Sequence, residues 1–363
     1  MKEEKRRYVG IDLGKREYTM AIIGSNGKVS HYHGTTSMQG RLALYRHLGK
    51  GDKVALEAGN LAFGMAREIQ EQVGNEVRVL NSAKLPYIWD APTKTDKEDA
   101  LKLAHLVEER CDEKLPIVPL PSEKEMERRK VVANYQREME SRTRLINQLH
   151  GLFVSQMITT VVKKELATAE RRRGAILVLR GQEREEAEFV LKHLELYEQR
   201  IAALKKKIQV EAKADEDMQL LQKIAGVGPI VSYAFMAHVG DGSRFSAGGQ
   251  VSNYLGFVPR LYYSGTIQRQ GHITKRGNGY LRGLLIQAAW AMVLSRKGGA
   301  LKERFIYLTK TQGKSKKRTI VSIGRRLTEL MYSVLRSKTE YEVRPWKGPG
   351  NDPERLAGQA MSA

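Results

Sequence analysis

Four carboxylates in the first hundred residues are the side chains of this sequence best suited to chemistry. Asp12 interrupts the apolar run 9–13, and Glu57 ends a second apolar run, 54–57, before a glycine turn. A buried carboxylate is costly unless something compensates its charge, and a metal ion would do so. Asp96 and Asp99 follow Thr95, a suitable N-cap, and their spacing of three places both on one face of a helix's first turn. We expect the four side chains to converge if the two apolar runs are neighbouring strands.

Ligands that are all oxygen favour Mg²⁺ or Mn²⁺. Two such ions about 4 Å apart stabilise the attacking and leaving oxygens of a phosphoryl displacement. Asp96 and Asp99 have another interpretation, as first-turn acids favoured by the helix dipole. The segment around Asp12 also resembles the first phosphate loop of sugar kinases and actin-like ATPases, but the second Asp-x-Gly loop of those proteins is missing here. We therefore predict a divalent metal site formed by Asp12, Glu57, Asp96 and Asp99.

The elements that must position these carboxylates can be predicted from apolar runs and turn residues. Three strands joined in hairpin order are followed by an alternation of helix and strand, which is the order of a ribonuclease-H-like α/β domain. The expected strands cover residues 8–13, 18–23, 29–32, 53–57 and 77–80, and the expected helices cover residues 41–48 and 63–73.

The middle of the sequence, residues 121–215, has the composition of long charged helices. From Ala187 to Ile208, apolar residues recur at alternating spacings of three and four, which is typical of a coiled-coil seam. An earlier seam runs from Val132 to Phe153 and is broken at Arg142. Two such helices could fold back as a hairpin or pair across a dimer, and the pattern favours neither.

The charge balance identifies the class of partner. The 62 Lys and Arg exceed the 41 Asp and Glu, for a net charge of +21 over 363 residues, which favours a polyanion: DNA, RNA or an acidic membrane surface. No apolar run approaches the length of a membrane-spanning helix, no signal region follows the first residues, and Cys111 is the only cysteine. We expect a cytoplasmic protein without a membrane partner, a disulfide framework or a cysteine zinc site.

A third region, near residues 220–335, carries most of the predicted nucleic-acid contacts. Its turn Gly226-Val227-Gly228 between two helical patterns resembles a helix-hairpin-helix turn, whose glycines let backbone N–H groups approach phosphate. A tight turn that contacts nothing is the alternative. Residues 265–326 contain 15 Lys and Arg but a single acid, Glu303. The predicted nucleic-acid-binding residues are Gly226, Gly228, Arg269, Lys275, Arg276, Arg282, Lys316, Lys317 and Arg318.

These patterns together resemble a known family, the bacterial transposases of the insertion sequence 110 family. The segments around Asp12, Glu57 and Asp96 to Asp99 resemble the family's Asp-Glu-Asp-Asp motif. The C-terminal half is similar in more detail, over segments that stand in the family's order: 226–229, 244–245, 254–259, 264–265, 273–278 and 281–282. The resemblance covers residues 8–335. The sequence departs from the family's pattern in two places. Residues Gly59-Asn60 stand where the family often has Thr-Gly, and the basic middle segment is longer.

The resemblance implies a RuvC-like N-terminal domain and a serine nucleophile, which maps to Ser264. It also implies DNA cleavage and rejoining through a phosphoserine, guidance by a structured non-coding RNA, and assembly as a tetramer. Considered by itself, Ser264 is an ordinary turn serine with no His-Asp pair nearby in the sequence.

The predicted organisation therefore has four parts. A RuvC-like metal-dependent nuclease domain covers residues 1–115, a coiled-coil region 116–215, and a mostly helical transposase domain with the candidate serine 216–340. A disordered tail covers residues 341–363. The predicted function is a transposase or recombinase that uses Mg²⁺ or Mn²⁺, binds DNA and a guide RNA, and forms a dimer or tetramer. The alternatives are a hydrolytic Holliday-junction resolvase and a nucleic-acid-binding protein with a vestigial carboxylate site.

Overall fold

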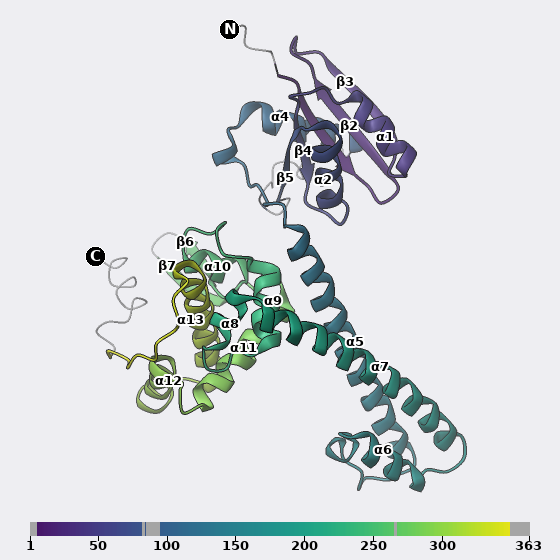
Figure 1. Cartoon of the computed structure of the whole chain (residues 1–363), viewed down its shortest axis with the longest axis vertical. Coiled ribbons are helices and arrows are strands. Elements are labelled where there is room, and N and C mark those ends of the chain that lie inside the picture. The colour runs from purple at the N-terminus through teal and green to yellow at the C-terminus, as the bar shows by residue number, and fades with distance from the viewer. Residues whose placement is uncertain (1–5, 82–83, 85–94, 265–266, 349–363) are drawn as a thin grey trace. The chain divides into compact units, whose positions relative to one another are not determined.

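The computed structural model describes residues 6–81, 84, 95–264 and 267–348 (Figure 1). Its description of residues 261, 263–264 and 267–270 is limited to the backbone. The chain forms two compact units, residues 1–122 and 123–363, each with its own core.

The first unit is built on a five-stranded mixed sheet of order β3-β2-β1-β4-β5. The first three strands are antiparallel neighbours, whereas β4 runs parallel to both β1 and β5. This is the hairpin order followed by alternation that the sequence predicts. Its elements are β1 (Tyr8–Leu13), β2 (Glu17–Ile23), β3 (Val29–Thr35), α1 (Met38–His47), β4 (Lys53–Glu57), α2 (Ala62–Val73), β5 (Glu76–Leu80), α4 (Asp96–Glu109) and η2 (Asp112–Lys114).

Helices cover both faces of this sheet. Val54 and Leu56 of β4 pack into one core with residues of α1 and α2. Ala55, between them, packs into a second core with Leu103 and Val107 of α4. Successive residues of a strand point to opposite faces. The sheet therefore has an α1/α2 face and an α4 face.

The second unit consists almost entirely of helices, apart from one two-stranded ribbon, in the part of the chain that is described. Two long helices lead into a bundle around a large apolar core. Its elements are α5 (Glu123–Ser155), η3 (Lys163–Leu166), α6 (Ala169–Ala175), η4 (Ile176–Val178), α7 (Gly181–Ala214), α8 (Glu216–Gln222), α9 (Pro229–Val239), α10 (Gly248–Tyr254), β6 (Pro259–Ser264), β7 (Ile267–Ile273), α11 (Gly279–Leu294), α12 (Gly299–Ile306), η5 (Tyr307–Thr311) and α13 (Lys316–Ser337).

Helices α5 and α7 pack against each other antiparallel within the chain (Figure 1), which is the hairpin alternative. Arg142, where the earlier apolar seam breaks, donates from Nε to Glu198 of α7 at 2.9 Å. The other Glu198 oxygen accepts from Arg172 at 2.6 Å, and Arg172 is almost completely buried. The interruption in the seam thus belongs to an Arg–Glu–Arg triad. Coiled-coil packing and self-association through these helices stay predictions.

The beginning of the predicted disordered tail lies against α12. The backbone N–H of Trp346 donates to Glu303 at 2.8 Å, and the rings of Trp346 and Tyr307 are 4.9 Å apart. The disorder of the tail stays a prediction. Residues 349–363 lie outside the described part. None of the helices described is long and apolar enough to cross a membrane.

Candidate active site and nucleic-acid interface

Asp12 and Glu57 occupy matching positions on neighbouring strands. The parallel pairing of β1 with β4 ends with Ile11 beside Leu56, so Asp12 and Glu57 are the next residue on each strand. Ile11 and Leu56 belong to the core on the α1/α2 face. By strand alternation, Asp12 and Glu57 lie on the α4 face, where both are half-buried. The sheet thus presents two adjacent carboxylates at one edge of one face.

Helix α4 lies directly on β1 at Gly10. A Cβ added to Gly10 would overlap the carbonyl oxygen of Ala100 and come within 2.8 Å of Leu103 Cβ. Further along α4, Leu106 and Val107 pack in the same core as Tyr8 at the start of β1. The helix therefore runs opposite to β1, and its first turn lies toward the end of the strand that carries Asp12.

The two carboxylates of the first turn of α4 differ in their surroundings. Thr95 caps the helix as predicted, its hydroxyl accepting from the backbone N–H of Glu98 at 3.3 Å. Asp99 is only 5% exposed, on the helix face that packs on the sheet, whereas Asp96 is exposed. The buried Asp99 Oδ1 accepts no hydrogen bond and has Lys102 Nζ at 3.6 Å. Asp99 therefore joins Asp12 and Glu57 on the α4 face, whereas Asp96 lies at its margin.

The chemistry of these four residues suits a divalent metal. The donors are all carboxylate oxygens, and the buried Oδ1 of Asp99 accepts no hydrogen bond, although Lys102 Nζ lies 3.6 Å away. The side chains are not drawn into a closed cluster, since the described residues contain no group of three metal-ligating side chains. The fold places the carboxylates at one edge of one face, and a bound ion would still have to draw them together.

In the second unit, Ser264 is the last residue of β6, in a ribbon that β6 and β7 form among the described residues. Its backbone pairs with Ile267, and Tyr262 pairs with Arg269. The sequence suggests only a turn here, so the ribbon is a feature that the prediction missed. The side chains of Ser264 and Arg269, together with Gly265 and Thr266, lie outside the description.

The base of the ribbon is locked to the end of α10. The backbone N–H of Lys275 donates to Gly256 at 3.2 Å, and that of Thr274 donates to Val258 at 2.8 Å. Arg282 Nη1 donates to the carbonyls of Leu255 at 2.8 Å and Arg276 at 3.1 Å. Lys275 adopts a left-handed conformation with φ of 55°, and its side chain and that of Arg276 are exposed. Arg282 thus holds the turn that presents the other two cations.

Asn278 links this turn to the bundle. Its Oδ1 caps α11 by accepting from Leu281 at 2.9 Å, so its Nδ2 faces His238 Nε2 at 3.0 Å. The pKa of His238 is lowered to about 4 by burial and by the positive charges of Arg129 and Arg244. The neutral imidazole then offers Nε2 as an acceptor to Asn278. Sequence reasoning treated this region only as motifs and missed this contact.

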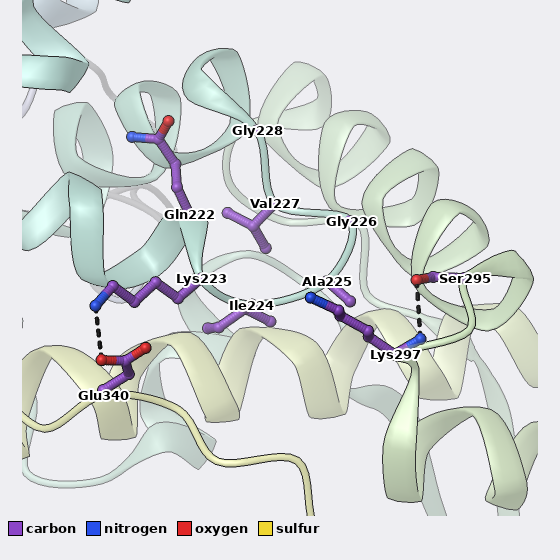
Figure 2. A pocket seen from close by; sticks show the side chains of 10 residues that line it. All are labelled: Gln222, Lys223, Ile224, Ala225, Gly226, Val227, Gly228, Ser295, Lys297 and Glu340. Carbon is purple, nitrogen blue, oxygen red and sulfur yellow. Dashed lines mark hydrogen bonds and ion pairs between the residues drawn. The ribbon is translucent and has the colours of Figure 1, made fainter.

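The glycine turn between α8 and α9 lines an open groove (Figure 2). Gly226 has φ of 86°, and a Cβ there would overlap the Ala288 carbonyl of α11, so the turn packs directly on that helix. A Cβ added to Gly228 would meet no other atom within 4 Å, so this side of the turn faces open space. The groove has a volume of about 710 Å³ and is lined by Gln222, Lys223, Ile224, Ala225, Gly226, Val227, Gly228, Ser295, Lys297 and Glu340.

Two cations that sequence reasoning did not select lie at this groove. Lys223 Nζ pairs with Glu340 at 2.6 Å, as Figure 2 shows, and Lys297 lines the wall beside Ser295. The predicted Lys316, Lys317 and Arg318 are exposed in the first turn of α13, which contains no acid. Cations are disfavoured at the positive end of a helix dipole, so an anionic ligand suits this turn.

Comparison with known proteins decides the family. The family described as "Transposase IS116/IS110/IS902 family" matches residues 218–305, and a second transposase family, DEDD_Tnp_IS110, matches residues 9–158. A "Probable family 20 transposase" of Pseudomonas aeruginosa is 30% identical over 303 residues, which cover 78% of this chain and 83% of that protein. The chain belongs to the IS110 family of transposases.

Two shorter similarities concern other mobile or inverted DNA. The transposase of insertion sequence element IS1111A from Coxiella burnetii is 30% identical over 141 residues, 39% of each chain. A pilin gene-inverting protein of Moraxella bovis is 30% identical over 126 residues, 34% of this chain and 38% of that protein. This IS110-family enzyme is therefore a DNA transposase or recombinase, with DNA as its partner.

The matched ranges of this transposase coincide with its two candidate sites. The range 9–158 contains all four carboxylates, and the Asp-Glu-Asp-Asp family it matches implies a RuvC-like fold and the use of a divalent metal. The range 218–305 contains the glycine turn, the β6–β7 ribbon and the Lys275 turn. The α13 cations lie beyond both ranges.

Proposed function

We propose that this transposase cuts and rejoins the DNA strands of a mobile element with Ser264 as nucleophile and Mg²⁺ or Mn²⁺ at the carboxylate site. The observation that carries the proposal is the matched placement of Asp12 and Glu57 on the α4 face, the face on which Asp99 is buried. A bound divalent cation would supply Lewis-acid polarisation of a phosphate oxygen.

The carboxylates bind and orient the ion in this proposal. Asp12, Glu57 and Asp99 hold it from rigid strand ends and a buried helix turn, and the exposed Asp96 completes the set from the margin. Gly10 contributes by letting α4 lie directly on β1. Positioning by regular elements suits the narrow tolerances of phosphoryl transfer.

Ser264 supplies the covalent step. Its Oγ attacks the scissile phosphorus, a P–O bond to the deoxyribose breaks, and the serine proton passes through solvent to the departing oxygen. A hydroxyl of another strand then attacks the phosphoserine, reforming a phosphodiester and returning the proton to Ser264. The number of phosphoester bonds is unchanged throughout, so rejoining needs no external energy source. The proposal requires Ser264 and the carboxylates to reach one phosphate, within one chain or between subunits.

The remaining predicted residues bind the nucleic-acid backbone. The open Gly226–Gly228 turn, the exposed Lys275 and Arg276, and the first turn of α13 offer N–H groups and cations with few competing acids. Such contacts position nucleic acid without reading its sequence. We assign the guide non-coding RNA and a dimer or tetramer to the same proposal, because the resemblance to the insertion sequence 110 family implies both.

Incubation of the full-length protein with branched DNA and Mg²⁺ tests the proposal. We expect a covalent protein–DNA adduct and recombined strands, and neither in EDTA. Nicked DNA without an adduct would instead support a hydrolytic resolvase. Binding without cleavage would support a nucleic-acid-binding protein with a vestigial site.

A further inference from the structure

Tyr262 is an exposed aromatic side chain on the β6–β7 ribbon. It lies in β6 with 56% of its surface exposed. The ribbon consists of two strands, so β6 pairs with β7 alone. A large ring that projects from so small a sheet contributes little to a core, which raises the question of what it binds.

The ring of Tyr262 is held in place by Gly271 of β7. A Cβ added to Gly271 would lie 2.9 Å from Tyr262 Cε2, tighter than such contacts allow, so the ring lies close over a position without a side chain. An aromatic ring that covers a strand glycine stabilises a sheet by itself. Packing on Gly271 covers only part of the ring here, and the rest of it is exposed.

The chemistry around the ring favours a nucleobase. The ribbon segment, residues 259–273, contains no acid. Arg260, two residues before Tyr262, is exposed, and so is His272 next to Gly271. An aromatic ring beside a cation that can follow a phosphate backbone is an arrangement on which bases of single-stranded nucleic acid stack. A protein partner would be expected to need acids or a wider apolar surface here.

We propose that Tyr262 stacks on an unpaired base of the DNA strand that is cut. The choice of the cut strand rests on the proposed function, because Ser264 is two residues further along the same strand of the ribbon. The base next to the scissile phosphate would then be held by stacking while the serine acts. Tyr262 is in this sense a positioning residue for the strand-transfer reaction.

The test measures binding of the full-length protein to a labelled single-stranded DNA oligonucleotide, to the same backbone with abasic sites, and to a single-stranded RNA of the same sequence. Tyr262→Ala should weaken binding to the first oligonucleotide about tenfold, the order of effect expected for the loss of one stacked base. It should leave binding to the abasic strand unchanged. Tyr262→Phe should bind both like the wild type, and Arg260→Gln should weaken both.

A second variant keeps the test valid if Tyr262→Ala disturbs the ribbon. In Tyr262→Trp the new indole should lose fluorescence on the base-bearing oligonucleotide and keep it on the abasic one. If Tyr262→Ala loses the same affinity for both DNA oligonucleotides, the stacking proposal is overturned but the proposed function is not. The same holds if the base-bearing oligonucleotide does not quench the indole fluorescence of Tyr262→Trp. A Tyr262 dependence seen only with RNA would overturn the assignment to the cut DNA strand. Failure of the wild type to bind either DNA would overturn the proposed function as well.

Discussion

Gly10 of β1 and Ala100 of α4 lie so close together that a Cβ on Gly10 would overlap the Ala100 carbonyl oxygen. Asp99 precedes Ala100, and Asp12 is two residues beyond Gly10 on the same face of β1. The contact therefore determines how the buried carboxylate of α4 approaches the carboxylate of the strand. A residue without a side chain thus sets the distance between two side chains of the candidate site.

Replacement of Gly10 by Ala should both destabilise the first unit and reduce DNA cleavage. The added methyl group cannot be accommodated unless α4 moves, which typically costs about 1–3 kcal/mol. Thermal unfolding and a cleavage assay measure the two effects. Gly64→Ala, in helix α2 with open space around it, is the matched control. It should keep activity and stability, because Ala favours helix. Equal behaviour of the two variants would refute the close packing at Gly10.

The buried carboxylate of α4 should be needed for cleavage but not for binding of DNA. Asp99→Asn removes a metal-ligating charge that we expect to be essential and should lower the cleavage rate at least about 100-fold, in line with the loss of a preorganised electrostatic contact. Glu98→Gln, an exposed neighbour in the same turn, should retain nearly full activity. Cleavage by Asp99→Asn at the wild-type rate would contradict the metal assignment.

Glu198 should be critical to the stability of the helical hairpin. Glu198→Ala leaves Arg172 almost fully buried without its carboxylate, and loss of one partner of a buried pair costs about 3–5 kcal/mol. The partial exposure of Glu198 favours the lower end. Glu195→Ala, which breaks the exposed pair with Arg173, should leave stability nearly unchanged, because solvent screens such a pair. Denaturant unfolding measures both, and a Glu198→Ala effect no larger than that of the control would contradict a structural function for the triad.

The groove beside the glycine turn should bind phosphate through Lys223. Lys223→Gln should lower the slope of log affinity for duplex DNA against log salt by about 0.9, the value for one lost phosphate contact. Glu340→Gln frees Lys223 from its acid and should raise affinity, whereas Glu127→Gln, which frees Lys207 on the hairpin, should not. An unchanged salt slope for Lys223→Gln would exclude the groove from the interface.

Much of the first unit follows from local patterns. Strands β1 and β4 have their predicted bounds, and Thr95 caps α4 as its position predicts. Asp12 and Glu57 were recognisable because a charge in an apolar run needs compensation. The different exposures of Asp96 and Asp99 were not predictable from their spacing, because they depend on where α4 meets the sheet at Gly10.

The second unit shows what local patterns miss. The sequence of the β6–β7 ribbon shows no sustained alternation of apolar and polar residues and therefore suggested only a turn. Arg172 stands in a run of three arginines that predicts an exposed surface, yet Glu198 of a distant helix buries it. The pairing of His238 with Asn278 likewise joins residues forty positions apart. The last two features depend on tertiary contacts that no short window of sequence contains.

The identity of the nucleophile is the central claim, and mapping a trapped protein–DNA adduct tests it most directly. The reaction with a cleavable DNA substrate and Mg²⁺ is stopped under denaturing conditions, and the modified peptide is identified by mass spectrometry. We predict a phosphodeoxynucleotide on Ser264, and no adduct from Ser264→Ala, which should still bind DNA and metal. An adduct on another residue, such as Tyr263 or Ser243, or strand exchange by Ser264→Ala, would contradict the account.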